Sequence, residues 1–335
     1  MPIFTLNNGI EFFYNDSGIP STSAYTTYFV VHGHTFHSGV FRRLLPVAHK
    51  NSHRMITVNR REYPGSTPYT QAELDVFAQG SNDERLNLLL NQGTNLAFLL
   101  DGLIQSLSLP PDIVIVGWSL GNLFTLSLLA SITSLPQTVR NRLALSVHKT
   151  IMWDITAHCI GMHILPMYIP LFDLDIPLEA RSLAFLKWIG YYFMHGDSSK
   201  HDVAQLDQGY CNVLNRRSTF DETAPEEVAE ITDFNPGPRC DNRLLDPGAF
   251  LEVERIIANK ALFDASTRSA WSGMDVWNFV GDASIPTAQV ATWSLEDQPT
   301  IYIAAIKGAN HFQMWDDPEG CMMDLHKLQS QERPS

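Results

Sequence analysis

The chain has 335 residues, of which 44% are hydrophobic and 18% are charged, and its formal net charge at pH 7 is −13. This length suits a single α/β core with a large insertion, and the apolar share is enough for a sizeable buried core. The negative charge disfavours a nucleic-acid partner and electrostatic binding to anionic membranes, both of which require basic surfaces.

Signals for export or membrane insertion are missing from the sequence. The N-terminal residues contain no basic segment followed by a long apolar run, and no stretch approaches the roughly 18–20 apolar residues of a membrane span. The four cysteines (Cys159, Cys211, Cys240 and Cys321) are far apart and match no metal spacing, so we expect free thiols. We therefore expect a cytoplasmic protein without membrane attachment. The pattern says nothing about oligomeric state.

Short apolar runs alternate with amphipathic stretches along most of the chain. In order, the pattern predicts a hairpin at 3–14 with a type I′ turn at Asn8-Gly9, strands at 25–31 and 55–59, a helix at 84–107, a strand at 113–116, a helix at 123–135, strands at 150–153 and 276–280, a helix at 287–296 and a strand at 300–306. This alternation predicts a mostly parallel α/β sheet flanked by helices.

The alternation breaks between 156 and 270, an interval too long for an ordinary connection. It is rich in prolines and aromatic residues. We expect it to form an inserted, largely helical cap domain over the active edge of the sheet. The core would then comprise residues 1–155 and 271–335.

The strongest motif is Gly117-Trp118-Ser119-Leu120-Gly121, which follows an apolar strand and precedes an apolar helix. A serine nucleophile sits on such a sharp strand-to-helix turn, where only small residues fit at the flanking positions. The turn exposes the hydroxyl near a helix N-terminus, whose amides can stabilise an oxyanion. Ser119 is therefore the candidate nucleophile.

With this motif the chain resembles the α/β-hydrolase superfamily. The resemblance also covers the N-terminal hairpin, His32-Gly33 after a strand, and Gly308-Ala309-Asn310-His311 after the last strand. The pattern looks most like capped esterases, lactonases, epoxide hydrolases and haloalkane dehalogenases, whereas residues 156–270 resemble these enzymes only as a cap. Because epoxide hydrolases and dehalogenases use an aspartate nucleophile, Ser119 favours the esterases and lactonases.

The resemblance implies roles for two further segments. His311 occupies the position of the catalytic base in the loop after the last strand, and the chain order of serine, acid and histidine agrees. In His32-Gly33-His34-Thr35, the backbone N–H of His34 would join that of Leu120 in the oxyanion hole. His32, His34 and His37 could also suggest metal ligands, but no carboxylate or cysteine pair accompanies them. We expect no metal and no cofactor.

Two carboxylates compete for the role of the triad acid. The superfamily usually carries this acid in a Gly-x-x-Asp turn after the seventh strand, and here that turn reads Gly281-Asp282-Ala283-Ser284, with serine at the acid position. The alternative placement, at the end of the sixth strand, holds Asp154. We favour Asp154 and keep Asp282 as the alternative.

The sequence does not identify the substrate-binding residues. Candidates are Trp118 beside the nucleophile, Tyr63 in the turn after the second parallel strand, and Trp188 and Tyr192 in the aromatic part of the cap. Packing of the cap is the competing interpretation for the last two. An apolar cavity with a few polar groups would suit a small-molecule substrate.

The expected function is hydrolysis of an ester or lactone of a fairly apolar small molecule through a Ser119–His311–Asp154 triad. Other interpretations remain open at this stage. The same triad can serve a thioester or C–C bond hydrolase, and the fold can also carry an acyltransferase, a cyclisation catalyst or a small-molecule receptor.

Overall fold

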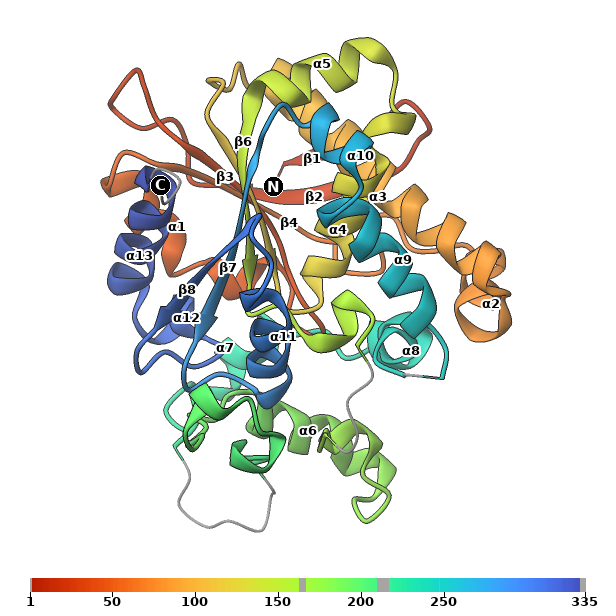
Figure 1. The fold of residues 1–335 in the computed structure, drawn as a ribbon, viewed down its shortest axis with the longest axis vertical. Coiled ribbons are helices and arrows are strands. Elements are labelled where there is room, and N and C mark those ends of the chain that lie inside the picture. The colour runs from red at the N-terminus through yellow and green to blue at the C-terminus, as the bar shows by residue number, and fades with distance from the viewer. Residues whose placement is uncertain (1, 163–166, 210–216, 247, 332–335) are drawn as a thin grey trace.

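The computed structural model describes residues 2–162, 167–209, 217–246 and 248–331. Across these residues, one eight-stranded sheet with the order β1-β2-β4-β3-β5-β6-β7-β8 forms the centre (Figure 1). The strands are β1 (Ile3–Thr5), β2 (Glu11–Asp16), β3 (Thr27–Val31), β4 (Arg54–Val58), β5 (Ile113–Trp118), β6 (Val147–Trp153), β7 (Asp275–Gly281) and β8 (Ile301–Ile306).

The N-terminal hairpin of β1 and β2 is present, but its turn differs from the expected type I′ form. A type I′ turn needs a positive φ at both Asn8 and Gly9, and of the two only Gly9 has one, of +83°. The amide of Leu6 donates to the carbonyl of Ile10 at 2.8 Å, and the amide of Gly9 donates to the carbonyl of Leu6 at 2.9 Å. The loop is one residue longer than expected, with glycine in the left-handed position at its end.

The six strands from β3 to β8 pair in parallel, whereas β1 and β2 join the sheet antiparallel. Every residue of β3, β4 and β5 is buried, as required of parallel strands that are covered on both faces. Alternate side chains of β3 belong to two separate hydrophobic cores, one on each face of the sheet. Phe29 and Val31 lie in the first core, and Tyr28 and Val30 lie in the second. The expected mostly parallel α/β sheet flanked by helices is confirmed.

Helices cover both faces of this sheet. The first core packs α3, α4, α5 and α9 against one face, and the second packs α1 and α13 against the other. The helices are α1 (Leu44–Lys50), α2 (Gln71–Gln79), α3 (Asn82–Ser106), α4 (Gly121–Ser131), α5 (Gln137–Ser146), α6 (Leu178–Ile189), α7 (Pro225–Ala229), α8 (Asn242–Leu244), α9 (Leu251–Leu262), α10 (Ala265–Ala270), α11 (Pro286–Glu296), α12 (Gln313–Asp316) and α13 (Pro318–Ser330).

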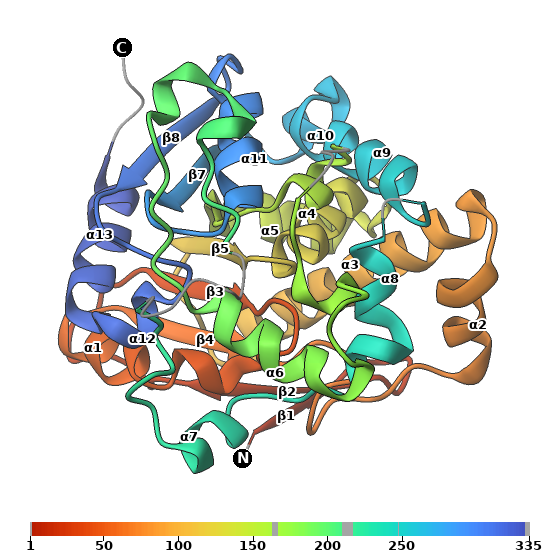
Figure 2. The ribbon, with the colours of Figure 1, turned by 90° about the horizontal axis from the view of Figure 1, so that it is seen from below.

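The chain between β6 and β7 divides into two parts. Figure 1 shows α6 beyond the lower end of the sheet, and Figure 2, which looks from that side, shows α6 in front of the strands. By contrast, α9 lies beside α4, and its residues Val253 and Ile257 belong to the same core as α3 and α4. The interval 156–270 therefore includes helices that cover a face of the sheet as well as segments at its edge.

Two smaller expectations can be compared with the described residues. No helix among them combines the length and the apolar character that a bilayer crossing requires. Cys159, Cys240 and Cys321 are buried free thiols. Cys211, the fourth expected free thiol, lies outside the described residues.

Candidate active site

Ser119 lies in the sharp turn between β5 and α4. Its φ is +54°, in the left-handed region that residues with a side chain rarely adopt. A Cβ on Gly121 would lie 2.2 Å from the carbonyl oxygen of Val31, and one on Gly117 would lie 2.4 Å from Oγ1 of Thr125. The neighbours of this turn therefore require glycine on both sides of the serine, as the motif predicts for a nucleophile turn.

His311 and Asp154 come together at the same edge of the sheet. Nδ1 of His311 lies 3.0 Å from Oδ2 of Asp154. The second carboxylate oxygen of Asp154 accepts the amide N–H of Gly281 at 3.0 Å. Both side chains are at most 1% exposed. A carboxylate held on two sides in this way can fix the orientation and tautomer of the imidazole.

The turn after β7 brings a serine to His311, instead of the aspartate that the superfamily usually carries there. Oδ1 of Asp282 accepts the amide of Gly308 at 2.6 Å, so this carboxylate is engaged within the loops. Oγ of Ser284 lies 3.2 Å from Nδ1 of His311. The structure thus brings Asp154 and Ser284 to the imidazole, whereas no hydrogen bond or ion pair joins Asp282 to His311. No contact of Ser284 with His311 is predicted from the sequence, although the place of Ser284 at the usual acid position is a signal for one.

The other imidazole nitrogen, Nε2 of His311, is buried and has no hydrogen-bond partner among the described residues. It is therefore not hydrogen-bonded to the Ser119 hydroxyl in this structure. Contacts between a nucleophile and its base are often long without substrate and tighten when substrate binds. With Nδ1 held by Asp154, Nε2 is the nitrogen left to accept a proton.

The backbone amides of His34 and Leu120, near Ser119, have no hydrogen-bond acceptor in the described part of the chain. Leu120 follows the nucleophile directly and precedes α4. The loop after β3 passes close to the serine, since a Cβ on Gly33 would lie 3.2 Å from Oγ of Ser119. Amides placed in this way are suited to stabilise negative charge on an oxygen bound above the serine.

A small cavity of about 30 Å³ opens above Ser119. Its apolar walls come largely from α6 and from the loops after β6 and β7, and its polar lining comes from histidine and threonine side chains. The lining residues are His34, Ser119, Leu120, Thr156, His158, Ile169, Phe185, Trp188, Ile189, Leu245, Ile285 and Thr287. This volume holds about one water molecule. A larger molecule would fit only if the covering segment, which is the described part of the chain from the end of β6 through Leu245, moved.

The four substrate-binding candidates occupy different places. Trp188 lines the cavity. Trp118 is buried below it, where its indole N–H donates to the carbonyl of His311 at 3.0 Å. The hydroxyl of Tyr63 donates to Asp241 at 2.7 Å behind the loop after β3, and the hydroxyl of Tyr192 donates to Asp316 at 2.5 Å. The structure therefore places only Trp188 of these four in the cavity wall.

The described residues hold no group of three or more histidine, cysteine or acidic side chains arranged for a metal ion. His32 and His34 make hydrogen bonds through both ring nitrogens. Burial lowers the pKa of His34 despite the nearby Asp241 carboxylate, so its ring is neutral at pH 7.

The fold is that of the α/β hydrolases. Solved structures similar to this chain include a carboxylesterase of the thaumarchaeon Nitrososphaera gargenis, with 13% identity over 98% of this chain and 97% of the other and a TM-score of 0.51. A bromoperoxidase from Bacillus anthracis has 15% identity over 98% of both chains and a TM-score of 0.50.

An enzyme that degrades N-acyl homoserine lactones has 15% identity over 98% of this chain and 100% of the other, with a TM-score of 0.51. No family model and no curated protein matches the sequence. At such identities the likeness shows the fold, and the chemistry has to be argued from the site.

Proposed function

We propose that this protein is a serine hydrolase that cleaves esters or lactones of fairly apolar small molecules. The observation that carries the proposal is the arrangement around His311. Its Nδ1 is held by Asp154 at 3.0 Å, and its Nε2 is buried without a partner among the described residues. A base oriented by a carboxylate on one side and unoccupied on the other is the arrangement that activates a serine hydroxyl.

The proposed reaction proceeds through an acyl-enzyme. Nε2 of His311 takes the proton of Ser119 while Oγ attacks the carbonyl carbon, and Asp154 stabilises the imidazolium. The amides of His34 and Leu120 bind the oxyanion of the tetrahedral intermediate. His311 then gives the proton to the leaving alcohol. A water molecule repeats the sequence on the acyl-enzyme, releasing the acid and restoring the serine.

The cavity and the structural relatives support the substrate class. Apolar side chains such as Phe185, Trp188 and Ile285 form much of the wall above Ser119, and none of the described residues that line it is arginine or lysine. An apolar acyl or ring system would replace water there with a gain of roughly 25 cal/mol for each Å² buried. Among the solved structures that share the fold, one is a carboxylesterase and another is an enzyme that degrades N-acyl homoserine lactones.

We further propose that the covering segment, from the end of β6 through Leu245, works as a cap. It contributes Phe185, Trp188 and Leu245 to the cavity wall, and it leaves little free volume over the serine. The cap would admit the substrate, close over it and exclude bulk water during acyl transfer.

A fluorophosphonate probe together with a 4-nitrophenyl butyrate assay tests the function. An activated hydroxyl attacks phosphorus as it attacks a carbonyl, so the folded protein should carry one adduct, on the peptide containing Ser119. Ser119→Ala should lose labelling and at least about 10³-fold of the turnover. Ser127→Ala, on the following helix, is the matched control and should retain both. Folded protein that acquires no adduct at Ser119 contradicts the proposal.

A further inference from the structure

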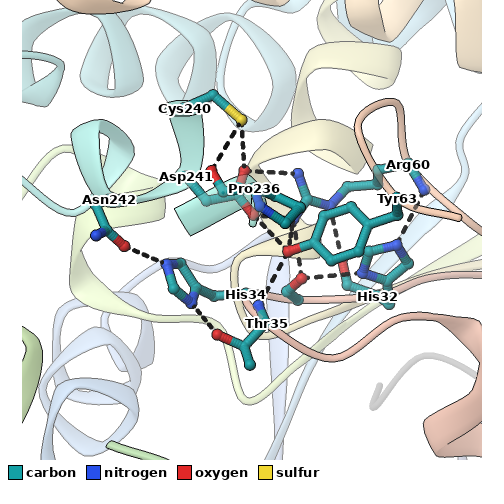
Figure 3. A network of polar contacts seen from close by, with 10 residues as sticks. His32, His34, Thr35, Arg60, Tyr63, Pro236, Cys240, Asp241 and Asn242 are labelled. Atoms are coloured by element: carbon teal, nitrogen blue, oxygen red, sulfur yellow. Dashed lines mark hydrogen bonds and ion pairs between the residues drawn. The ribbon is translucent and has the colours of Figure 1, made fainter. Parts of the chain in front are cut away.

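A buried ion pair lies behind the loop that carries His34. Arg60 follows β4 and contacts Asp241 with Nη2 to Oδ2 at 2.6 Å and Nη1 to Oδ1 at 3.2 Å (Figure 3). Both side chains are 1% exposed. Burial alone would lower the pKa of Arg60, but the Asp241 carboxylate, together with Tyr63 and Tyr69, more than offsets burial and raises it. Removing two charges from water is costly, so the position of this pair calls for a functional explanation.

The remaining donors of Arg60 reach the backbone of the same loop. Nε donates to the carbonyl of His32 at 3.2 Å, and Nη2 donates to the carbonyl of Gly33 at 2.9 Å. The amide of Arg60 donates to Nε2 of His32 at 3.0 Å, so the ring proton sits on Nδ1, which donates to the carbonyl of Gly33 at 2.9 Å. The carbonyl of Gly33 is thus held by two donors from one side.

The carbonyl of Gly33 and the amide of His34 belong to one peptide group. In a trans peptide the C=O and N–H bonds point in opposite directions. Two donors on the carbonyl therefore turn the N–H of His34 away from Arg60. His34 lines the cavity above Ser119, and Gly33 lies against the serine hydroxyl. We propose that Arg60 is a positioning residue that fixes this peptide group so that the N–H of His34 serves the oxyanion.

The next residue of the loop is held by the same carboxylate. The amide of Thr35 donates to the hydroxyl of Tyr63 at 2.9 Å, and that hydroxyl donates to Oδ2 of Asp241 at 2.7 Å. Thr35 has a φ of +66°, a strained conformation that needs such support. Asp241 ends the π-helical turn Gly237–Asp241, in the segment that covers the site. The covering segment therefore helps to hold the oxyanion loop.

This positioning role rests on the proposed function, and its test measures the oxyanion hole directly. The substrates are 4-nitrophenyl butyrate and its thiono analogue, in which sulfur replaces the carbonyl oxygen. Developing negative charge on sulfur accepts hydrogen bonds poorly, so an intact oxyanion hole favours the oxygen ester. The ratio of the two kcat/KM values reports how well the amides are placed, and a general loss of active protein leaves it unchanged.

Arg60→Lys keeps the positive charge but cannot bond Asp241 and both carbonyls at once. We expect its kcat for the oxygen ester to fall about 10–100-fold, with KM within about threefold, because losing a whole oxyanion donor costs about 10²–10³ in kcat. The ratio of kcat/KM for the oxygen ester to kcat/KM for the thiono ester should fall by a similar factor. Arg54→Lys is the matched control. Arg54 is also buried and bonds Asp16 with two nitrogens, at the other end of β4. Arg54→Lys should therefore lower Tm and leave the ratio of the two kcat/KM values unchanged.

The double variant Arg60→Met/Asp241→Leu removes both charges and leaves neither one unpaired, so it tests the role if the lysine variant does not fold. It should also lose kcat and the oxygen preference. An unchanged ratio in folded Arg60→Lys or in the double variant would overturn the positioning role. The wild type separates the two proposals. If it neither labels at Ser119 nor hydrolyses the ester, the proposed function and this inference both fail. If it does both, only the Arg60 variants decide.

Discussion

At the level of single residues, Asp154 is held in place through its backbone and through both carboxylate oxygens. It follows β6 directly, has a φ of +45° and is fully buried. Its amide donates to the carbonyl of Phe279 at 2.7 Å. Its two carboxylate oxygens contact the amide of Gly281 and Nδ1 of His311. Both backbone partners, Phe279 and Gly281, belong to β7. An aspartate held in this way by its neighbouring strand can keep one imidazole tautomer without a large reorganisation when charge develops.

Asp154→Asn should therefore reduce kcat about 10³–10⁴-fold, because the amide cannot stabilise the imidazolium and can favour the wrong tautomer. Asp282→Asn is the natural comparison, since Asp282 bonds the amide of Gly308 and makes no bond to His311. It should change kcat less than about tenfold. Steady-state kinetics on 4-nitrophenyl butyrate, with circular dichroism as a check on folding, measures both. The reverse ranking would assign the acid to the turn after β7.

The sequence singles out Asp154 and Ser119 as candidates because strand ends can be located from local patterns. A short apolar run ending in an aspartate marks Asp154, and a run followed by a glycine turn marks Ser119. The Arg60–Asp241 pair could not be found in this way, because 181 positions separate the partners and neither carries a local signal. The same holds for the contact of Ser284 with His311, which depends on the packing of two loops.

At the level of secondary structure, α13 is docked on the sheet by unusual polar contacts. Nζ of Lys149 donates to the carbonyls of Leu328, Gln329 and Gln331 at the end of the helix. Nearer the middle, Nδ1 of His326 lies 3.1 Å from Nε2 of His53, a buried residue just before β4. These contacts join the last helix to the strands by electrostatic interactions as well as by apolar packing.

The histidine pair makes this docking sensitive to pH. Burial and the neighbouring His326 lower the pKa of His53 from 6.5 to about 4, and the more distant Asp112 opposes them. Because the folded-state pKa is the lower one, protons bind the unfolded chain preferentially. The stability that neutral, buried His53 contributes to the folded state is complete above about pH 6.5 and is lost as the pH falls toward 4.

His53→Gln should therefore show a smaller drop in Tm between pH 7 and pH 5 than the wild type. Calorimetry at the two pH values measures the difference. The matched control is His49→Gln, on the exposed side of α1, which should follow the wild-type pH dependence. Parallel Tm curves for the wild type and His53→Gln would show that this pair does not govern the acid sensitivity.

The elements themselves were predictable to different degrees. The parallel strands were found because each contains a short β-prone run, and the run in β5 is wholly apolar. The packing of α9 on α4 could not be predicted, because the amphipathic pattern of α9 does not say whether its apolar side faces the sheet or a cap. The predicted cap, residues 156–270, includes α9 only because of its place in the chain.

For the whole molecule, the main question is how a substrate reaches Ser119. Hydrogen bonds join the covering segment to the loop after β8 and to α12. Nδ2 of Asn310 donates to the carbonyl of Gly190 at 3.0 Å and to Oγ1 of Thr219 at 2.8 Å. Oδ2 of Asp316 accepts from Tyr192 and Thr219 at 2.5 and 2.7 Å. Opening the cover would expose these groups to water, which would replace the bonds at modest cost.

The closed cavity of about 30 Å³ should also limit the length of the acyl group. Trp188 is the largest side chain in its wall and is 2% exposed. Trp188→Ala would open space for an acyl chain beside Ser119. Each additional buried methylene is worth about 0.8 kcal/mol. Space for two more would raise kcat/KM for 4-nitrophenyl octanoate relative to the acetate by on the order of tenfold.

Leu183→Ala is the matched control, because Leu183 lies on the same helix but is 69% exposed on its outer side. It should leave the acyl-chain preference unchanged, and a Tm measurement would show whether either variant disturbs the fold. A preference that stays fixed in Trp188→Ala, with the fold intact, would mean that the acyl group does not occupy the space beneath α6. The segment would then control access to Ser119 without shaping the substrate pocket.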